Sequence, residues 1–172
     1  QADDLVIMAQ DTDADDWPDH DDVLGNTIRK CGRPVLVIPP GFHGNTIGDN
    51  ILLGWSGTRE ATRAAHDLLA IATPRAAIGL LTIGKPVDRD LKTVDATDLA
   101  KTYARHGLEP DILRRHPDGK TVAETILNEA GVRGADLIAT GAFGHSRGYD
   151  PIVDGATNDL LTTATLPVLY SH

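Results

Sequence analysis

The sequence predicts an α/β protein with an open, parallel, five-stranded sheet that has helices on both faces. Short apolar segments alternate along the chain with segments whose apolar residues have helical spacing. Most of the short segments are continuously apolar, which is typical of strands buried on both faces of a sheet. Parallel neighbours need crossover connections, so alternating strands and helices favour a doubly covered parallel sheet.

The first part of the chain contains a strand, a helix and a strand. Leu5 to Ala9 is an apolar run that predicts a strand, and Val23 to Lys30 predicts a short helix. Gly32 is placed to end that helix, and Pro34 to Ile38 predicts the next strand. The stretch that follows is rich in proline and glycine, which is typical of a linker, and we place the linker at residues 41–49.

After the linker the pattern restarts and runs to the end of the chain. Thr58 can cap the first helix of this part, and Thr121 with Glu124 forms a capping box that opens a later one. In chain order we predict strand 51–55, helix 58–72, strand 78–83, helix 93–106, strand 111–115, helix 121–130, strand 137–140, helix 156–163 and strand 168–170.

An internal repeat divides the chain into two parts. The segments ADDLVIMAQ and RPVLVIPP near the start are similar to GADLIATGA and LPVLYSH near the end. We therefore predict that residues 1–40 are the C-terminal part of a first domain and that residues 50–172 are a complete second domain. Three elements alone cannot bury a proper core, so the first part must dock onto the second domain or be completed by further chain.

Composition and charge exclude several classes of function. The formal net charge of -9 disfavours binding to nucleic acid or to an anionic membrane through a basic face. No apolar run approaches the length of a membrane span, and no signal peptide is visible. Cys31 is the single cysteine, so an intramolecular disulfide is impossible, and a cytoplasmic location fits best.

Two long segments carry a resemblance to a known family. The segment ADLIATGAFGHSRGYDPIVDGATNDLLTTATLPVLYSH resembles the closing part of universal stress protein domains, and NILLGWSGTREATRAAHDLLAIA resembles their opening strand and first helix. The resemblance covers residues 50–172 as a full domain and residues 1–39 as the end of a preceding one, as in tandem members. It implies a Rossmann-like fold of the adenine nucleotide alpha hydrolase type and a site for ATP or another adenine nucleotide.

The resemblance also implies the residues of that site. The family motif is a glycine, two residues, a second glycine and about nine residues before a Gly-Ser or Gly-Thr pair. By this match, and because parallel strands carry ligands at their carboxyl ends, the expected nucleotide-binding residues are Trp55, Ser56, Gly57, Thr58, Gly141, Gly144, His145, Ser146, Arg147, Gly155, Ala156 and Thr157. Trp55 at a strand end can either stack on a base or simply pack, and the glycines can equally mark a structural turn.

The sequence departs from the family pattern at two positions. Asp154 stands where the family usually has the first glycine of the pair, and the loop after the first strand of the domain lacks the aspartate common in ATP-binding relatives. A carboxylate beside a triphosphate repels it by about 1 to 4 kcal/mol. We therefore expect a degenerate nucleotide site.

Other candidate sites are weaker. Asp11, Asp13 and Asp15, with Asp22 at the twelfth position, imitate the ligand spacing of a calcium loop. Asp16 stands where that loop needs glycine, and its twelfth ligand should be glutamate, so we predict a solvated loop without a metal or a nucleotide. The histidines have no metal-ligand spacing, and no nucleophile elbow or Walker loop occurs.

These observations predict a cytoplasmic stress-response binding module rather than an enzyme, with a weak ATPase activity left open. The alternative is a structural or dimerisation module that binds no nucleotide. In either case the strands Pro34 to Ile38 and Pro167 to Tyr170 are expected to pair with each other, as a pseudo-dimer, or with a second copy, as a homodimer.

Overall fold

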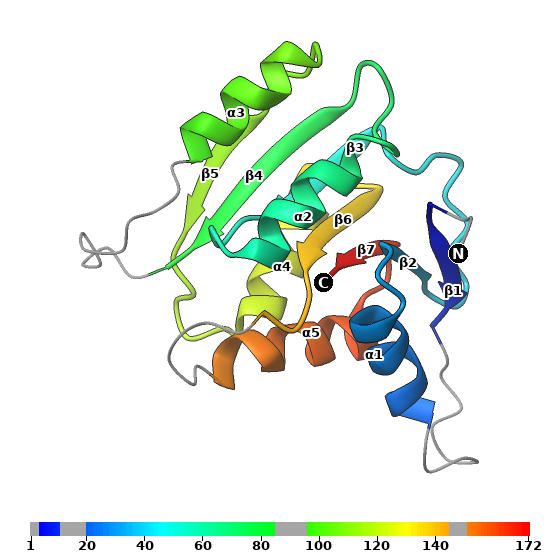
Figure 1. Ribbon diagram of the computed structural model, residues 1–172. Helices are drawn as coiled ribbons and strands as arrows, with labels where there is room; N and C mark the ends of the chain where they lie inside the picture. Colours follow the sequence, from blue (N-terminus) through cyan, green and yellow to red (C-terminus); the bar gives the residue numbers. More distant parts are fainter. Residues whose placement is uncertain (1–3, 11–19, 85–95, 145–150) are drawn as a thin grey trace.

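The computed structural model describes residues 4–10, 20–84, 96–144 and 151–172, with the side chains of residues 20–22 and 151–154 excepted. Its strands form one sheet in the order β1-β2-β7-β6-β3-β4-β5 (Figure 1). The elements in chain order are β1 Val6–Ala9, α1 His20–Lys30, β2 Val35–Ile38, β3 Asn50–Gly54, α2 Arg59–Leu68, β4 Ala77–Ile83, α3 Ala96–Arg105, β5 Asp111–Arg115, α4 Val122–Arg133, β6 Leu137–Gly141, α5 Pro151–Thr163 and β7 Val168–Ser171.

Within the described residues the sheet has seven strands, so the predicted number of five strands is wrong. The predicted five strands are present and parallel, in the order β7-β6-β3-β4-β5. The segment β1–α1–β2, which we call the N-terminal unit, extends the same sheet because β2 pairs with β7. That pairing is antiparallel, with Leu36 opposite Leu169. It satisfies backbone groups that would otherwise line two free sheet edges.

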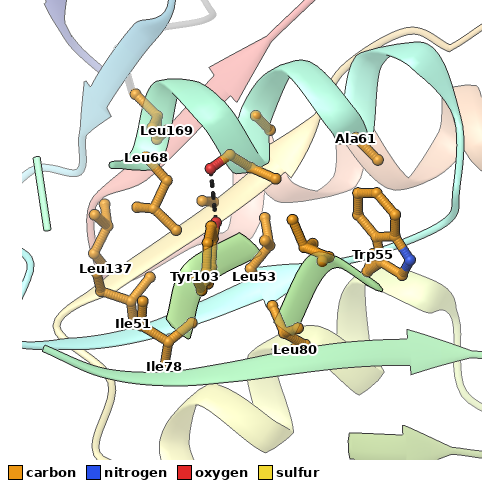
Figure 2. Packing of buried hydrophobic residues seen from close by; sticks show 14 of the residues in the cluster. Ile51, Leu53, Trp55, Ala61, Leu68, Ile78, Leu80, Tyr103, Leu137 and Leu169 are labelled. Atoms are coloured by element: carbon orange, nitrogen blue, oxygen red, sulfur yellow. Dashed lines mark hydrogen bonds between the residues drawn. The ribbon is translucent and has the colours of Figure 1, made fainter. Parts of the chain in front are cut away.

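Helices cover both faces of the sheet. Leu68 of α2 and Tyr103 of α3 lie in one apolar cluster, together with Ile51 and Leu53 of β3 (Figure 2). Ile28 of α1, Ile126 of α4 and Leu160 of α5 lie in a second cluster. The two clusters receive alternate residues of β2, β3, β6 and β7, as expected for strands of a pleated sheet that is buried on both sides.

Tyr103 ties α3 to α2 in the first cluster. Its side chain is fully buried, and its hydroxyl donates a hydrogen bond of 2.7 Å to the carbonyl oxygen of Ala65 (Figure 2). Burial raises the pKa of this hydroxyl well above its ordinary value. The group therefore stays neutral and acts as a donor inside the core.

The predicted helix caps are confirmed. The hydroxyl of Thr58 accepts a hydrogen bond from the Ala61 amide at 3.2 Å. In α4 the Glu124 amide donates to Thr121 Oγ1 at 3.1 Å, and the Thr121 amide donates to Glu124 Oε2 at 2.6 Å. Helix α5 begins at Pro151, earlier than the predicted start at Ala156, because proline is favourable in the first turn of a helix.

The end of the predicted linker is anchored to the start of β6. The carboxylate of Asp136 accepts hydrogen bonds of 3.0 Å from the amides of Gly48, Asp49 and Asn50, and one of 2.8 Å from the Thr46 hydroxyl. The linker therefore leads into β3 along a path that Asp136 fixes.

Candidate functional site

The candidate site lies at the carboxyl ends of β3 and β6. These two strands are parallel neighbours, with Gly54 opposite Thr140 at their ends. After β3 the chain adds β4 and β5 on one side of it, and then adds β6 and β7 on its other side (Figure 1). The point between β3 and β6 is therefore the topological switch point of the sheet. In open α/β sheets such a switch point forms a crevice for ligands. The structure thus places the two predicted loops side by side.

The loop after β3, residues Trp55–Thr58, contributes hydroxyls and a helix N-terminus. Gly57 has φ of 70°, which lets the chain turn directly into the Thr58 cap of α2. The hydroxyls of Ser56 and Thr58 lie 3.2 Å apart. The first amides of a helix have no partner inside it, and together with the helix dipole they favour an anionic or polar group nearby.

Trp55 belongs to the core in this structure. Its side chain is only 6% exposed and lies in the same apolar cluster as Ala61 (Figure 2). Its amide donates a hydrogen bond of 2.7 Å to the carbonyl oxygen of Leu81. Of the two interpretations of this residue, packing agrees better with its burial than stacking on a base.

The end of β6 and the turn after it, residues Gly141–Gly144, form what we call the glycine loop, and it lies against the first turn of α2. A Cβ added at Gly141 would lie 2.5 Å from the Ala61 amide nitrogen. At Gly144, an added Cβ would lie 3.1 Å from Glu60 Oε2 and 3.8 Å from Thr58 Oγ1. Close approach of α2 therefore explains why residue 141 has no side chain, without any ligand.

Glu60 is a site residue that sequence reasoning missed. It is 4% exposed, and its carboxylate oxygen Oε1 lies 3.1 Å from Nη2 of its neighbour Arg59. Its carboxylate lies beside Gly144, so the site carries a buried negative charge where a phosphate group would have to approach. The available signal was an acid two residues after a helix cap, a position that the helix dipole favours in any helix.

Three other predicted residues lie within α5 rather than before it. Gly155, Ala156 and Thr157 follow the Pro151 start by more than a turn, where backbone amides are used inside the helix. Thr157 still reaches the site through its side chain, because its buried hydroxyl accepts a hydrogen bond of 3.3 Å from the Phe143 amide. The predicted residues His145, Ser146 and Arg147 lie outside the described residues.

The C-terminus also lies at the glycine loop. His172 Nδ1 is 3.0 Å from the carbonyl oxygen of Ala142, and the Ala142 amide donates to the Ser171 carbonyl at 2.8 Å. The position of His172 at the end of the chain gave no sequence signal for this role. It adds an imidazole ring beside the glycine loop.

The remaining candidates contribute less. Among the described residues no three His, Cys, Asp or Glu side chains are grouped so that they could hold a metal ion. Asp11, Asp13, Asp15 and Asp16 of the acidic segment lie outside those residues. A hollow of about 130 Å³ lies between the end of β5 and the start of α4. It is small for a nucleotide, and Glu129 pairs there with Arg115 at 2.7 Å.

The fold and the site define a doubly wound α/β protein with polar loops at its switch point. Solved structures with this architecture include universal stress proteins. A universal stress protein from Archaeoglobus fulgidus superposes with a TM-score of 0.66 at 15% identity, over 98% of this chain and 60% of its own. Another from Archaeoglobus fulgidus has a TM-score of 0.52 at 19% identity, over 70% of this chain and 96% of its own.

A protein of unknown function from Pseudomonas aeruginosa PAO1 superposes with a TM-score of 0.55 at 18% identity, over 98% of this chain and 62% of its own. This chain therefore spans about three fifths of the two longer proteins. No family model matches the sequence, and no curated protein has significant similarity to it. The chain thus has the universal stress protein fold. Within the described residues, none of the helices could cross a membrane.

Proposed function

We propose that the chain is a universal stress protein that acts as a cytoplasmic binding module, with a degenerate site for ATP or another adenine nucleotide. The observation that carries the proposal is the meeting of the glycine loop and the N-terminus of α2 at the switch point of the sheet. The fold shared with universal stress proteins supports the same assignment. The proposal assigns no catalytic residue.

The electrostatics of the site make the proposed affinity low. The Glu60 carboxylate is buried beside Gly144, and the Arg59 guanidinium that pairs with it has an 80% exposed side chain. An exposed cation compensates a buried anion only in part, because water screens it. A triphosphate would therefore meet net negative charge at this end of α2.

A thermal unfolding experiment tests this proposal. We expect millimolar ATP with Mg²⁺ to raise the midpoint of the wild type by a few degrees, since each kcal/mol of binding free energy adds about 2 to 4 °C. Glu60→Gln should show a larger ATP-dependent rise because it removes the repelling charge. Glu109→Gln, which changes an exposed residue just before β5, is the matched control and should respond like the wild type.

The midpoint of thermal unfolding also decides whether the chain binds a nucleotide. If ATP moves the midpoint of neither the wild type nor Glu60→Gln, the nucleotide proposal fails. Release of phosphate above the rate of a blank would instead move the assignment towards a weak ATPase.

A specific observation favours a second candidate function, a structural module that acts through its last strands. Strands β2 and β7 pair antiparallel, with Val35 opposite Tyr170 and Leu36 opposite Leu169. All four of these residues are buried. A homodimer stays a prediction, and the molecular mass in solution tests it.

We further propose the tandem organisation, in which residues 1–40 end a first domain, residues 41–49 link it and residues 50–172 form a complete domain. Ile7 of β1 is paired with Leu36 of β2, and on the other side of the β2–β7 pairing Ala139 of β6 is paired with Leu169 of β7 in the same way. Ala139 is fully buried on the α2 side of the sheet, whereas Ile7 is 65% exposed. A strand and helix equivalent to β3 and α2 would bury it.

A further inference from the structure

Phe143, in the glycine loop, has an unusual backbone conformation. Its φ of 51° lies in the left-handed region, which a bulky residue adopts only when its surroundings hold it there. One of these restraints is the hydrogen bond from its amide to the Thr157 hydroxyl. Phe143 is 2% exposed, so the residues that pack on its ring also restrain its backbone.

Helix α1 of the N-terminal unit supplies that cover. The guanidinium carbon of Arg29 lies 3.4 Å from the centroid of the Phe143 ring, in cation–π geometry. Gly25, one turn earlier on α1, also faces the ring. A Cβ added at Gly25 would lie 3.5 Å from the ring and 3.2 Å from Arg29 Nη1. This surface of α1 therefore fits Phe143 closely.

Phe143 thus connects the N-terminal unit with the candidate site. On one side of it stands α1, and on the other Gly144 lies against Glu60 and Thr58. A change in the packing of the ring must move the backbone of the loop, because Ala142 and Gly144 are its direct neighbours.

We propose that Arg29 and Gly25 are positioning residues for the glycine loop, and that α1 clamps Phe143 so that ligand binding at the loop and docking of the N-terminal unit are coupled. The ligand half of this inference rests on the proposed nucleotide function. Coupling of this kind is reciprocal, so a ligand that needs the clamped loop must also stabilise α1 against the sheet. A loop released from the clamp would bind less tightly, since only part of its population would be competent.

The first arm of the test needs no ligand. Hydrogen exchange of the Ala142–Gly144 amides is compared with that of β6 in Arg29→Leu, Arg29→Lys and Lys30→Leu. We expect the loop amides of Arg29→Leu to exchange about 2- to 30-fold faster, the range given by the free energy of a cation–π contact. Arg29→Lys should show a smaller increase because it keeps the cation. Lys30→Leu removes the adjacent exposed cation and should leave the loop unchanged.

A purely structural contact gives a different result. In that case Arg29→Leu would raise exchange in the loop and in β6 by the same factor, or in neither, and the clamp would be overturned. Lys30→Leu with the same effect as Arg29→Leu would also overturn it, because net charge rather than the ring contact would then be responsible.

The second arm uses ATP with Mg²⁺ as the probe. We expect ATP to slow exchange in α1 of the wild type and to raise its thermal midpoint more than that of Arg29→Leu. Equal rises in midpoint would overturn the coupling while leaving the proposed function intact. If ATP leaves both the wild type and Glu60→Gln unchanged, nucleotide binding and its coupling both fail, and the first arm alone decides whether α1 clamps the loop.

Discussion

The glycines of the sequence motif have different surroundings in the fold. Gly141 faces the backbone of α2, so close that an added Cβ would lie 2.5 Å from a main-chain nitrogen. Gly155 lies inside α5 with nothing within 4 Å of an added Cβ. Backbone cannot move aside as the end of a flexible side chain can. Gly141 is therefore required by packing and Gly155 is not.

This difference predicts opposite effects of alanine at the two positions. Gly141→Ala should lower the free energy of unfolding by about 1 to 3 kcal/mol or more, through overpacking. Gly155→Ala should raise it by about 0.5 to 1 kcal/mol, because glycine is costly inside a helix. Urea unfolding without any ligand measures both, and Gly131→Ala in α4, also in open space, is the matched control for Gly155→Ala. A neutral Gly141→Ala would contradict the packing explanation.

At the scale of single elements, Asp136 links the linker to the sheet. Burial alone would raise the pKa of its carboxyl, but hydrogen bonds from three amides and the Thr46 hydroxyl outweigh burial and lower it below its ordinary value of 3.8. The ionised form is thus favoured in the folded state. Its stabilising effect is complete above the unfolded pKa and is lost as the pH falls through the lower folded pKa.

We therefore predict that Asp136→Asn is destabilising in a pH-dependent way. At pH 7 it should cost about 1 to 3 kcal/mol, because an amide group cannot accept from all four donors and presents a donor of its own. The difference from the wild type should begin to shrink below pH 3.8, where the carboxyl of the unfolded chain becomes protonated, and should disappear as the pH falls through the lower folded pKa. Urea unfolding as a function of pH measures this. Asp98→Asn, at an exposed ion pair with Lys101, should change little at any pH.

Local sequence signals predicted the elements well. Strand β5 has the predicted bounds, Asp111 to Arg115, and the capping box of Thr121 and Glu124 is present. Such features depend on residues that are close together in the sequence, so a single sequence is enough to predict them. The start of α5 was predicted too late, at Ala156 rather than Pro151, although proline suits the first turn of a helix.

The candidate site was predicted less completely, because its chemistry depends on contacts between distant segments. The sequence identified the two loops, and the parallel sheet brings them together. It gave no indication that Glu60 would be buried beside Gly144, that His172 would reach Ala142, or that α1 would cover Phe143. Each of these contacts joins residues that no short motif connects.

At the scale of the whole molecule, the seam between β2 and β7 joins the N-terminal unit to the rest of the sheet. Leu36 and Leu169 lie opposite each other at its centre, 5% and 0% exposed. Polar contacts support the seam from α2. Arg63 donates a hydrogen bond of 2.7 Å to the carbonyl oxygen of Gly32, and Ser171 donates one of 2.8 Å to Asp67. Strand β1 is bound to the sheet through β2.

If residues 50–172 form a complete domain, as proposed, weakening the seam should release the N-terminal unit first. Leu36→Ala leaves a cavity at the seam that should cost about 2 to 5 kcal/mol. Hydrogen exchange should then accelerate strongly in β1 and β2 and much less in β3 and β4. Val132→Ala, which truncates a 76% exposed side chain on α4, should change neither pair of strands. Equal acceleration in all four strands would mean that residues 1–40 are integral to one cooperative unit, and the proposed division into domains would then be wrong.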